Sequence, residues 1–322
     1  MKGSRSIVTN LLILLVILLF PMDSFAVDSR QNINIVTTVA PITNIVQNIV
    51  GSDVNVTGIV PNSIDSHTFE PVPTDAKLLA NADIIIVNGL DLEIPTLKLA
   101  EKVKMPDTPI VQLGNSTLQE EDWQYDFSFP RELGHPNPHL WTNIALVIRY
   151  AEIIRDSLVT LNPRHKDTYT KNTVAYVEKL QQLDIAIFSC VESIPENNRK
   201  LITYHDSFAY FAPRYGMEVV AAVQPSNFSE PGPQEVIRVI EQIKKEAIPA
   251  IFGSEVFPSK VMEQIAREAG AQFIDQLSDD ELPPAPNNSF IGMMAKNMRI
   301  MTGALGGNPD CVAGIDTSNF FP

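Results

Sequence analysis

NPRHKDTYTKNTVAYVEKLQQLDIAIFSCVESI, residues 162–194, is the longest helical pattern in this chain. Asn162 can cap the helix and Pro163 suits its first turn, whereas Pro195 ends the pattern. Apolar side chains recur at spacings of three or four residues, at Val177, Leu180, Leu183, Ile187 and Val191. A helix of this length spans roughly 45 Å. The pattern therefore predicts one long, stiff helix in the middle of the chain.

On both sides of this helix, short β-branched runs alternate with amphipathic segments, which is typical of parallel sheets flanked by helices. Before the helix, strands are expected at residues 33–39, 54–60, 83–88 and 109–113; after it, they are expected at 200–204, 217–223, 250–253 and 271–274. We predict an α/β protein of two lobes, each a mostly parallel sheet with helices around it. The N-terminal lobe covers residues 27–161, the linking helix 162–194 and the C-terminal lobe 195–322.

The first 26 residues resemble an export signal rather than part of the fold. Lys2 and Arg5 precede the apolar run 11–20, and Ser24-Phe25-Ala26 has small residues where signal peptidase cuts. The apolar run is shorter than the ~20 residues that a membrane-spanning helix needs. We predict a signal peptide that is cleaved after Ala26 and a periplasmic location.

Charge and cysteine content exclude several classes of protein. Lys and Arg total 24 against 38 Asp and Glu, a formal net charge of -14, which argues against nucleic acid as a partner. Two cysteines are too few for a disulfide scaffold or a four-cysteine zinc site. Because the expected compartment is oxidising, Cys190 and Cys311 can form a bridge, but two free thiols fit the sequence equally well.

Three of the five histidines lie where ligands bind in parallel sheets. His67 follows the strand 54–60, His139 follows a long loop, and His205 lies between the strand 200–204 and the next helix. One such histidine alone is more often a solvated or capping residue. Three that project from strand ends of both lobes can converge only in the cleft between the lobes.

Asp275 occupies the corresponding place after the predicted strand 271–274. Without the histidines it would be interpreted as a helix cap or a turn acid. Together with them it completes a shell of three neutral nitrogens and one carboxylate oxygen, which suits a borderline divalent ion such as zinc. We therefore predict a metal site made of His67, His139, His205 and Asp275.

Two glutamates lie near these positions in sequence. Glu70 is three residues beyond His67, and Glu255 follows the strand 250–253. Either carboxylate could accept a hydrogen bond from the far nitrogen of a liganding histidine and so fix its tautomer. The alternative is a loop carboxylate bonded to nearby backbone amides.

Several motifs, in order, resemble the zinc and manganese solute-binding proteins of ABC importers, the cluster A-I binding proteins. The motifs are DSHTFEP at 65–71, similar to D-P-H-x-Y-E-P; PHLW at 138–141, similar to P-H-x-W; His205 with Tyr210-Phe211, similar to H-x-x-x-x-Y-F; and DQL at 275–277, similar to D-S-L. The resemblance covers nearly the whole mature chain. It implies two lobes bridged by a rigid helix, with His67, His139, His205 and Asp275 as the metal ligands.

The resemblance also implies a function: capture of a divalent metal outside the cytoplasm and its delivery to the membrane permease of an ABC importer. Manganese-selective relatives commonly have a carboxylate in the third ligand position, so His205 favours zinc over manganese or iron. The His-rich stretch of many zinc-specific relatives is missing before His139. Docking on an importer suits a monomer. A closed shell of four protein ligands leaves no position for a reactive water, so no enzymatic activity is expected.

Two other functions stay open at this point. In a secreted zinc-dependent hydrolase, the three histidines would bind the ion and Glu70 or Glu255 would be the general base. No HExxH motif supports this reading, and Asp275 would fill the vacant position. In the other alternative the chain binds a metal chelate or an organic solute, because a two-lobed architecture does not by itself name a ligand.

Overall fold

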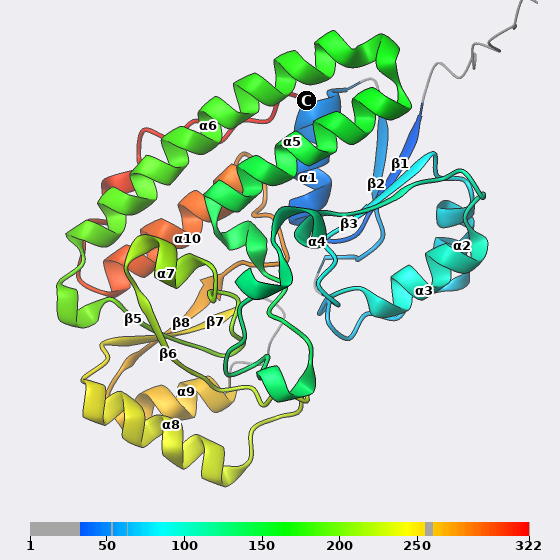
Figure 1. The fold of residues 1–322 in the computed structure, drawn as a ribbon. Coiled ribbons are helices and arrows are strands. Elements are labelled where there is room, and N and C mark those ends of the chain that lie inside the picture. The colour runs from blue at the N-terminus through cyan, green and yellow to red at the C-terminus, as the bar shows by residue number, and fades with distance from the viewer. Residues whose placement is uncertain (1–32, 53, 63, 255–259, 322) are drawn as a thin grey trace, which may run out of the picture. The chain divides into compact units, whose positions relative to one another are not determined.

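Two four-stranded parallel sheets form the framework of this computed structural model, which describes residues 33–52, 54–62, 64–254 and 260–321 (Figure 1). The first sheet has the order β2-β1-β3-β4 and consists of β1 (Asn34–Thr37), β2 (Asn55–Gly58), β3 (Ile84–Val87) and β4 (Ile110–Gln112). The second has the order β6-β5-β7-β8 and consists of β5 (Lys200–Thr203), β6 (Glu218–Ala222), β7 (Ala250–Ser254) and β8 (Gln272–Leu277). All eight expected strands are present, and the fold class is confirmed. The expected signal peptide, residues 1–26, lies outside the described residues.

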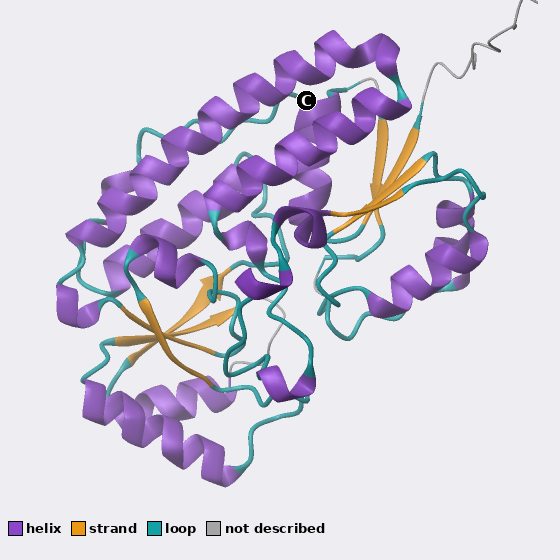
Figure 2. Ribbon diagram, viewed as in Figure 1, coloured by secondary structure: helices purple, strands orange, loops and turns teal. Residues whose placement is uncertain are grey.

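Each sheet is covered by helices on both faces (Figure 2). In β3, Ile84 and Ile86 join the largest hydrophobic core, whereas Ile85 and Val87 face a second core with Leu79. This second core lies against α2 (Pro73–Ala80) and α3 (Ile94–Val103). The second sheet has an equivalent outer core with α8 (Pro233–Glu246) and α9 (Lys260–Ala269). An apolar run without alternation thus forms a strand that is buried on both sides.

The long helical pattern forms α6 (Lys166–Ser193), after one 3₁₀ turn over Pro163–His165. Its inner side packs against α1 (Ala40–Val50), α5 (Ile144–Leu161), α7 (Phe211–Tyr215) and α10 (Phe290–Ala304). The remaining short helix, α4 (Leu113–Thr117), packs on α5. Since α1 connects β1 to β2 of the first sheet and α7 connects β5 to β6 of the second, α6 contacts both halves of the chain, as Figure 1 shows. The largest hydrophobic core therefore has members from both sheets, and the described residues form a single compact unit.

A disulfide joins Cys190 to Cys311, with 5.2 Å between their Cα atoms. It connects the last turns of α6 to the 3₁₀ turn Pro309–Val312, near the end of the chain. The structure thus contains the bridge that the sequence left open. Over the described ranges, none of the helices combines the length and hydrophobicity that a membrane span requires.

Candidate metal centre

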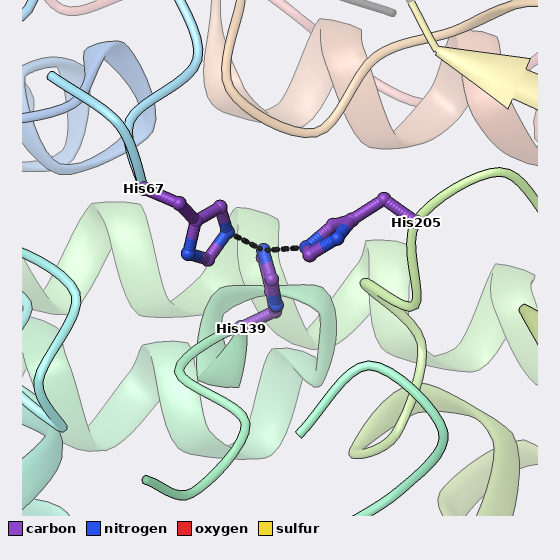
Figure 3. Close-up of side chains that lie close together, drawn as sticks. All are labelled: His67, His139 and His205. Carbon is purple, nitrogen blue, oxygen red and sulfur yellow. Dashed lines mark hydrogen bonds between the residues drawn. The ribbon is translucent and has the colours of Figure 1, made fainter. Parts of the chain in front are cut away.

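Three imidazole rings converge at one point (Figure 3). Nε2 of His139 lies 3.2 Å from Nε2 of His67 and 3.3 Å from Nε2 of His205. The three rings offer ligand nitrogens that all lie within 4.8 Å of one another. Across the described chain, no other group of three or more His, Cys, Asp or Glu side chains has this spacing. We call these residues the histidine cluster.

The topology of the two sheets explains why the cluster forms. His67 lies in the loop after β2, and His205 lies two residues after the end of β5. Since parallel strands of one sheet all end at the same edge, both residues project from the carboxyl edges of their sheets. His139 immediately precedes the 3₁₀ turn Leu140–Thr142, which leads into α5. His139 is 1% exposed and His205 is 4% exposed, whereas His67 is half-buried.

Two amide side chains fix the orientation of two of the rings. Oδ1 of Asn137 accepts hydrogen bonds from both Nδ1 and the backbone nitrogen of His139, at 2.8 and 2.9 Å. Oε1 of Gln224 accepts from Nδ1 of His205 at 3.1 Å. Because the amide oxygens only accept, the proton of each ring is on Nδ1. Nε2 of both rings therefore directs a lone pair into the cluster, as a metal ligand must.

Asn137 is itself held on its other side. Its Nδ2 donates to Oδ2 of Asp126 and to the backbone oxygen of Asp206, both at 2.7 Å. The backbone oxygen of Pro138 accepts a bond of 2.8 Å from Nδ2 of Asn88, the residue after β3. Contacts from both lobes thus hold the segment that carries His139.

The histidine cluster is electrically neutral near pH 7. Burial lowers the pKa of His67 to about 3. The pKa of His139 lies well below its usual range. The main cause is burial, and repulsion from the charged forms of His205 and His67 adds to it. Burial and repulsion from the charged form of His67 also hold the pKa of His205 well below its usual range. The charge of Asp65 and the hydrogen bond to Gln224 raise this pKa, but by less. Neutral imidazole is the form that binds metal, so the cluster is prepared for a cation before the cation arrives.

Aromatic rings shield His67 from the solvent. Phe228 stacks on it with ring centroids 5.0 Å apart and 19° between the planes, and Phe129 lies 5.4 Å away. Both phenyl rings and His67 line a pocket of about 270 Å³. His135 lies in the same pocket wall but is exposed, and its Nδ1 is 2.9 Å from Oδ2 of Asp91. His135 is therefore separate from the histidine cluster.

The structure does not bring Asp275 to the histidine cluster. The sequence predicts that the strand ends at Ile274, but β8 continues to Leu277, which pairs with residue 254 of β7. Asp275 therefore lies within the strand, and its side chain is exposed. The carboxyl edge of the sheet is reached only at Ser278, and the acids that follow it there, Asp279 and Asp280, are both buried.

Of the two glutamates, only Glu70 lies among the described residues, and it makes no hydrogen bond to a ring of the histidine cluster. Glu70 is exposed, and Glu255 lies outside the described residues. Asn137 and Gln224 occupy the positions next to the imidazole Nδ1 atoms instead. The sequence gives no signal for either amide, since a neutral side chain has neither the charge nor the metal-ligand chemistry that would single it out.

The chain resembles known metal-binding proteins in sequence and in fold. Residues 35–304 match the family model described as "Zinc-uptake complex component A periplasmic". The chain is 32% identical over 272 residues to the iron-binding protein YfeA of Yersinia pestis, covering 83% of this chain and 85% of that protein. It is 28% identical over 304 residues to the metal ABC transporter substrate-binding lipoprotein FimA of Streptococcus parasanguinis, covering 90% and 96%. The solved structure of the periplasmic zinc-binding protein TroA of Treponema pallidum superposes with a TM-score of 0.77 at 27% identity, covering 85% and 99%.

Proposed function

The chain belongs to the zinc-uptake complex component A family, and on this premise we propose that it captures a divalent transition-metal ion outside the cytoplasm and delivers it to the permease of an ABC importer. The observation that carries the proposal is the convergence of the three Nε2 atoms of His67, His139 and His205. In a core that only packs side chains, each of these three buried, neutral nitrogens would need a hydrogen-bond donor. They form a ready coordination site for a cation.

Zinc is the ion that this site fits best. Zinc, a borderline-soft ion, binds imidazole nitrogens in four-coordinate geometry, whereas magnesium, calcium and manganese prefer oxygen ligands. The relatives are named for iron, for metal in general and for zinc, so the choice here rests on the donor atoms of this chain. Iron and manganese are expected to bind more weakly than zinc.

Transport, rather than catalysis, accounts for the site. The family consists of transporter binding proteins. In a hydrolase, a general base would have to reach a metal-bound water. Of the two glutamates considered for that role, Glu70 is exposed and Glu255 is outside the described residues. The export signal, with cleavage after Ala26, would deliver the chain to the periplasm, where a monomer would dock on the permease.

A zinc titration tests the proposal. Metal-free protein is titrated with Zn²⁺ in competition with a chromogenic chelator, and the variants His139→Ala and His205→Ala are compared with the exposed control His165→Ala. We expect one ion per chain in the wild type and in the control, and at least a hundredfold loss of affinity in both cluster variants. Wild-type affinity in the two cluster variants would overturn the proposal. Zinc-dependent hydrolysis of a p-nitrophenyl ester by the wild type would favour the hydrolase.

A further inference from the structure

Asp126, in the long loop that leads to the histidine cluster, binds two parts of that loop through one carboxylate. Its Oδ1 accepts hydrogen bonds from the backbone nitrogens of Ser128 and Phe129, at 2.9 and 3.1 Å. Its Oδ2 accepts a bond of 2.7 Å from Nδ2 of Asn137. The carboxylate thus joins the turn that begins at Asp126 to the amide of Asn137.

The turn places the ring of Phe129 against the cluster. The centroid of this ring lies 5.4 Å from those of His67 and His205 and 5.8 Å from that of His139. Phe129 is 6% exposed, so the contact is buried. Asp126 binds the backbone N–H of Phe129 itself, and therefore helps to set where the ring lies.

On the other side of the carboxylate, every hydrogen-bonding position of the Asn137 amide is in use. Oδ1 accepts two bonds from His139, and Nδ2 donates one bond to Asp126 and one to the backbone oxygen of Asp206. Asn137 is 0% exposed, and a buried donor without an acceptor is costly. The place of Oδ1 beside His139 therefore depends on the acceptors that hold Nδ2.

Only a carboxylate fits the position of Asp126. Three N–H donors converge on the side chain, one on Oδ2 and two on Oδ1. An ionised acid is the side chain that offers acceptors at both ends and no donor. An amide of the same shape has one acceptor and one donor end, so it can match the turn or Asn137 but not both.

We propose that Asp126 is a positioning residue of the metal site: its carboxylate holds the amide of Asn137, which keeps the proton of His139 on Nδ1 and leaves Nε2 free for the ion. The inference rests on the proposed function and adds a residue that acts on the ion through two others. Asp126 is not a ligand, and it lies outside the group of three imidazoles. Its second contact, with the turn at Phe129, supports the cluster from another side.

The test compares Asp126→Asn and Asp126→Ser with the control Tyr210→Phe. Asp126→Asn keeps an oxygen for the two turn amides but places an N–H group opposite Nδ2 of Asn137. Asp126→Ser keeps a hydroxyl that can accept from the turn, and its side chain is too short to reach Asn137. Tyr210→Phe removes a different bond of the same loop, which the backbone nitrogen of Gln124 donates to the tyrosine hydroxyl at 3.1 Å.

Zinc affinity is measured at pH 7 by competition with a chromogenic chelator. We expect both variants of Asp126 to weaken zinc binding on the order of tenfold, and Tyr210→Phe to stay within about twofold of the wild type. Thermal unfolding of the metal-free proteins shows that each variant is folded. Since Asp126→Ser introduces no donor opposite Asn137, its loss of affinity would come from the missing bond and not from a repulsive contact.

The position of the ring proton of His139 is a readout that a purely structural role of the loop would leave unchanged. In metal-free protein labelled with nitrogen-15 in histidine, the chemical shifts of the ring nitrogens distinguish Nδ1–H from Nε2–H, and His139→Ala assigns the signals. The wild type and Tyr210→Phe should show His139 with its proton on Nδ1. Both variants of Asp126 should show a shift toward the Nε2–H form.

Two outcomes would overturn the inference. In one, both variants of Asp126 bind zinc like the wild type. In the other, they lose affinity while the tautomer of His139 is unchanged, because Asp126 would then only support the fold. Failure of the proposed function is distinct from both, since His139→Ala would then bind zinc like the wild type.

Discussion

Oδ1 of Asn137 lies 2.8 Å from Nδ1 of His139 and accepts its proton. The same oxygen accepts the backbone N–H of His139, which establishes that it is the oxygen and not the amide nitrogen that faces the ring. The bond places the ring proton away from the histidine cluster and leaves Nε2 as the ligand atom. An uncharged residue two positions away in sequence thus determines which nitrogen of His139 can bind a metal ion.

Asn137→Ala should lower zinc affinity by roughly 10- to 100-fold, because His139 loses the bond that fixes its tautomer and orientation. The measurement is competition with a chromogenic chelator at pH 7. Asn143→Ala is the matched control, since Asn143 lies nearby and caps α5 by accepting a bond from the nitrogen of Ala145 at 3.0 Å. It should cost about 1 kcal/mol of stability and leave affinity unchanged. Equal affinities in the two variants would refute a tautomer-fixing role for Asn137.

Phe228→Ala should speed the release of bound metal. Phe228 stacks on His67 and has a positive φ of 58°, a conformation that is unfavourable for a bulky residue. Removing the ring opens the side of the cluster that faces the pocket, so the dissociation rate should rise by about tenfold, as rates of release respond more than rates of binding. Stopped-flow mixing of loaded protein with excess chelator measures the rate. Phe127→Ala, at a ring that is 54% exposed, should release metal at the wild-type rate.

The metal-free protein should lose stability as the pH rises from 6.5 to 8. Burial and the charge of Asp126 raise the pKa of Asp206 from 3.8 to about 8. The folded state then binds this proton more tightly than the unfolded chain, so its contribution is present at low pH and disappears as the pH rises through that window. The three cluster imidazoles, which are half protonated in the unfolded chain at pH ~6.5 and neutral in the folded one, lose these protons over the same window and oppose the fall by about 1 kcal/mol in total.

Urea unfolding at several pH values measures this effect. Asp206 alone should lower the free energy of unfolding by about 1–2 kcal/mol between pH 6.5 and 8, and the difference in slope between the wild type and Asp206→Asn isolates this contribution. Asp206→Asn should show a smaller slope, because the group that titrates is gone. A variant with the same slope as the wild type would show that the carboxyl group of Asp206 does not carry the proton.

Removing the disulfide should affect stability and leave metal binding intact. The bond between Cys190 and Cys311 closes a loop with a sequence separation of 121. The free energy of unfolding of the double variant Cys190→Ser, Cys311→Ser should be lower by about 2–5 kcal/mol, because the unfolded chain regains the conformational entropy that the closed loop removes. Zinc affinity should stay within threefold of the wild type, since the bond joins the C-terminal end of α6 to the turn Pro309–Val312 and neither element carries a cluster histidine. A parallel loss of affinity would show that the bond also supports the site.

Local patterns in the sequence are enough to predict the sheets and the histidine cluster. Pro41 and Gly51 mark the two ends of α1, and Gly51 has the positive φ of 79° that favours glycine at such a stop. His67 and His205 follow strands, and parallel strands end at one edge, so their convergence follows from the topology. The helix α5 could also have been found, because its buried residues Val147, Tyr150, Ala151, Ile154 and Leu158 recur at helical spacing.

Other features depend on contacts between distant segments. The sequence around Asp275 shows an acid after an apolar run, but pairing with β7 extends the strand past it. Asn137 and Gln224 acquire their roles only because the fold places their oxygens beside imidazole nitrogens.

The most direct test is a crystal structure of the zinc-loaded protein with anomalous difference maps recorded on both sides of the zinc absorption edge. We predict a single strong peak per chain, bound by Nε2 of His67, His139 and His205 at about 2.0–2.1 Å, the usual distance for zinc and imidazole. A peak elsewhere in the chain, with the three rings left uncoordinated, would contradict the account.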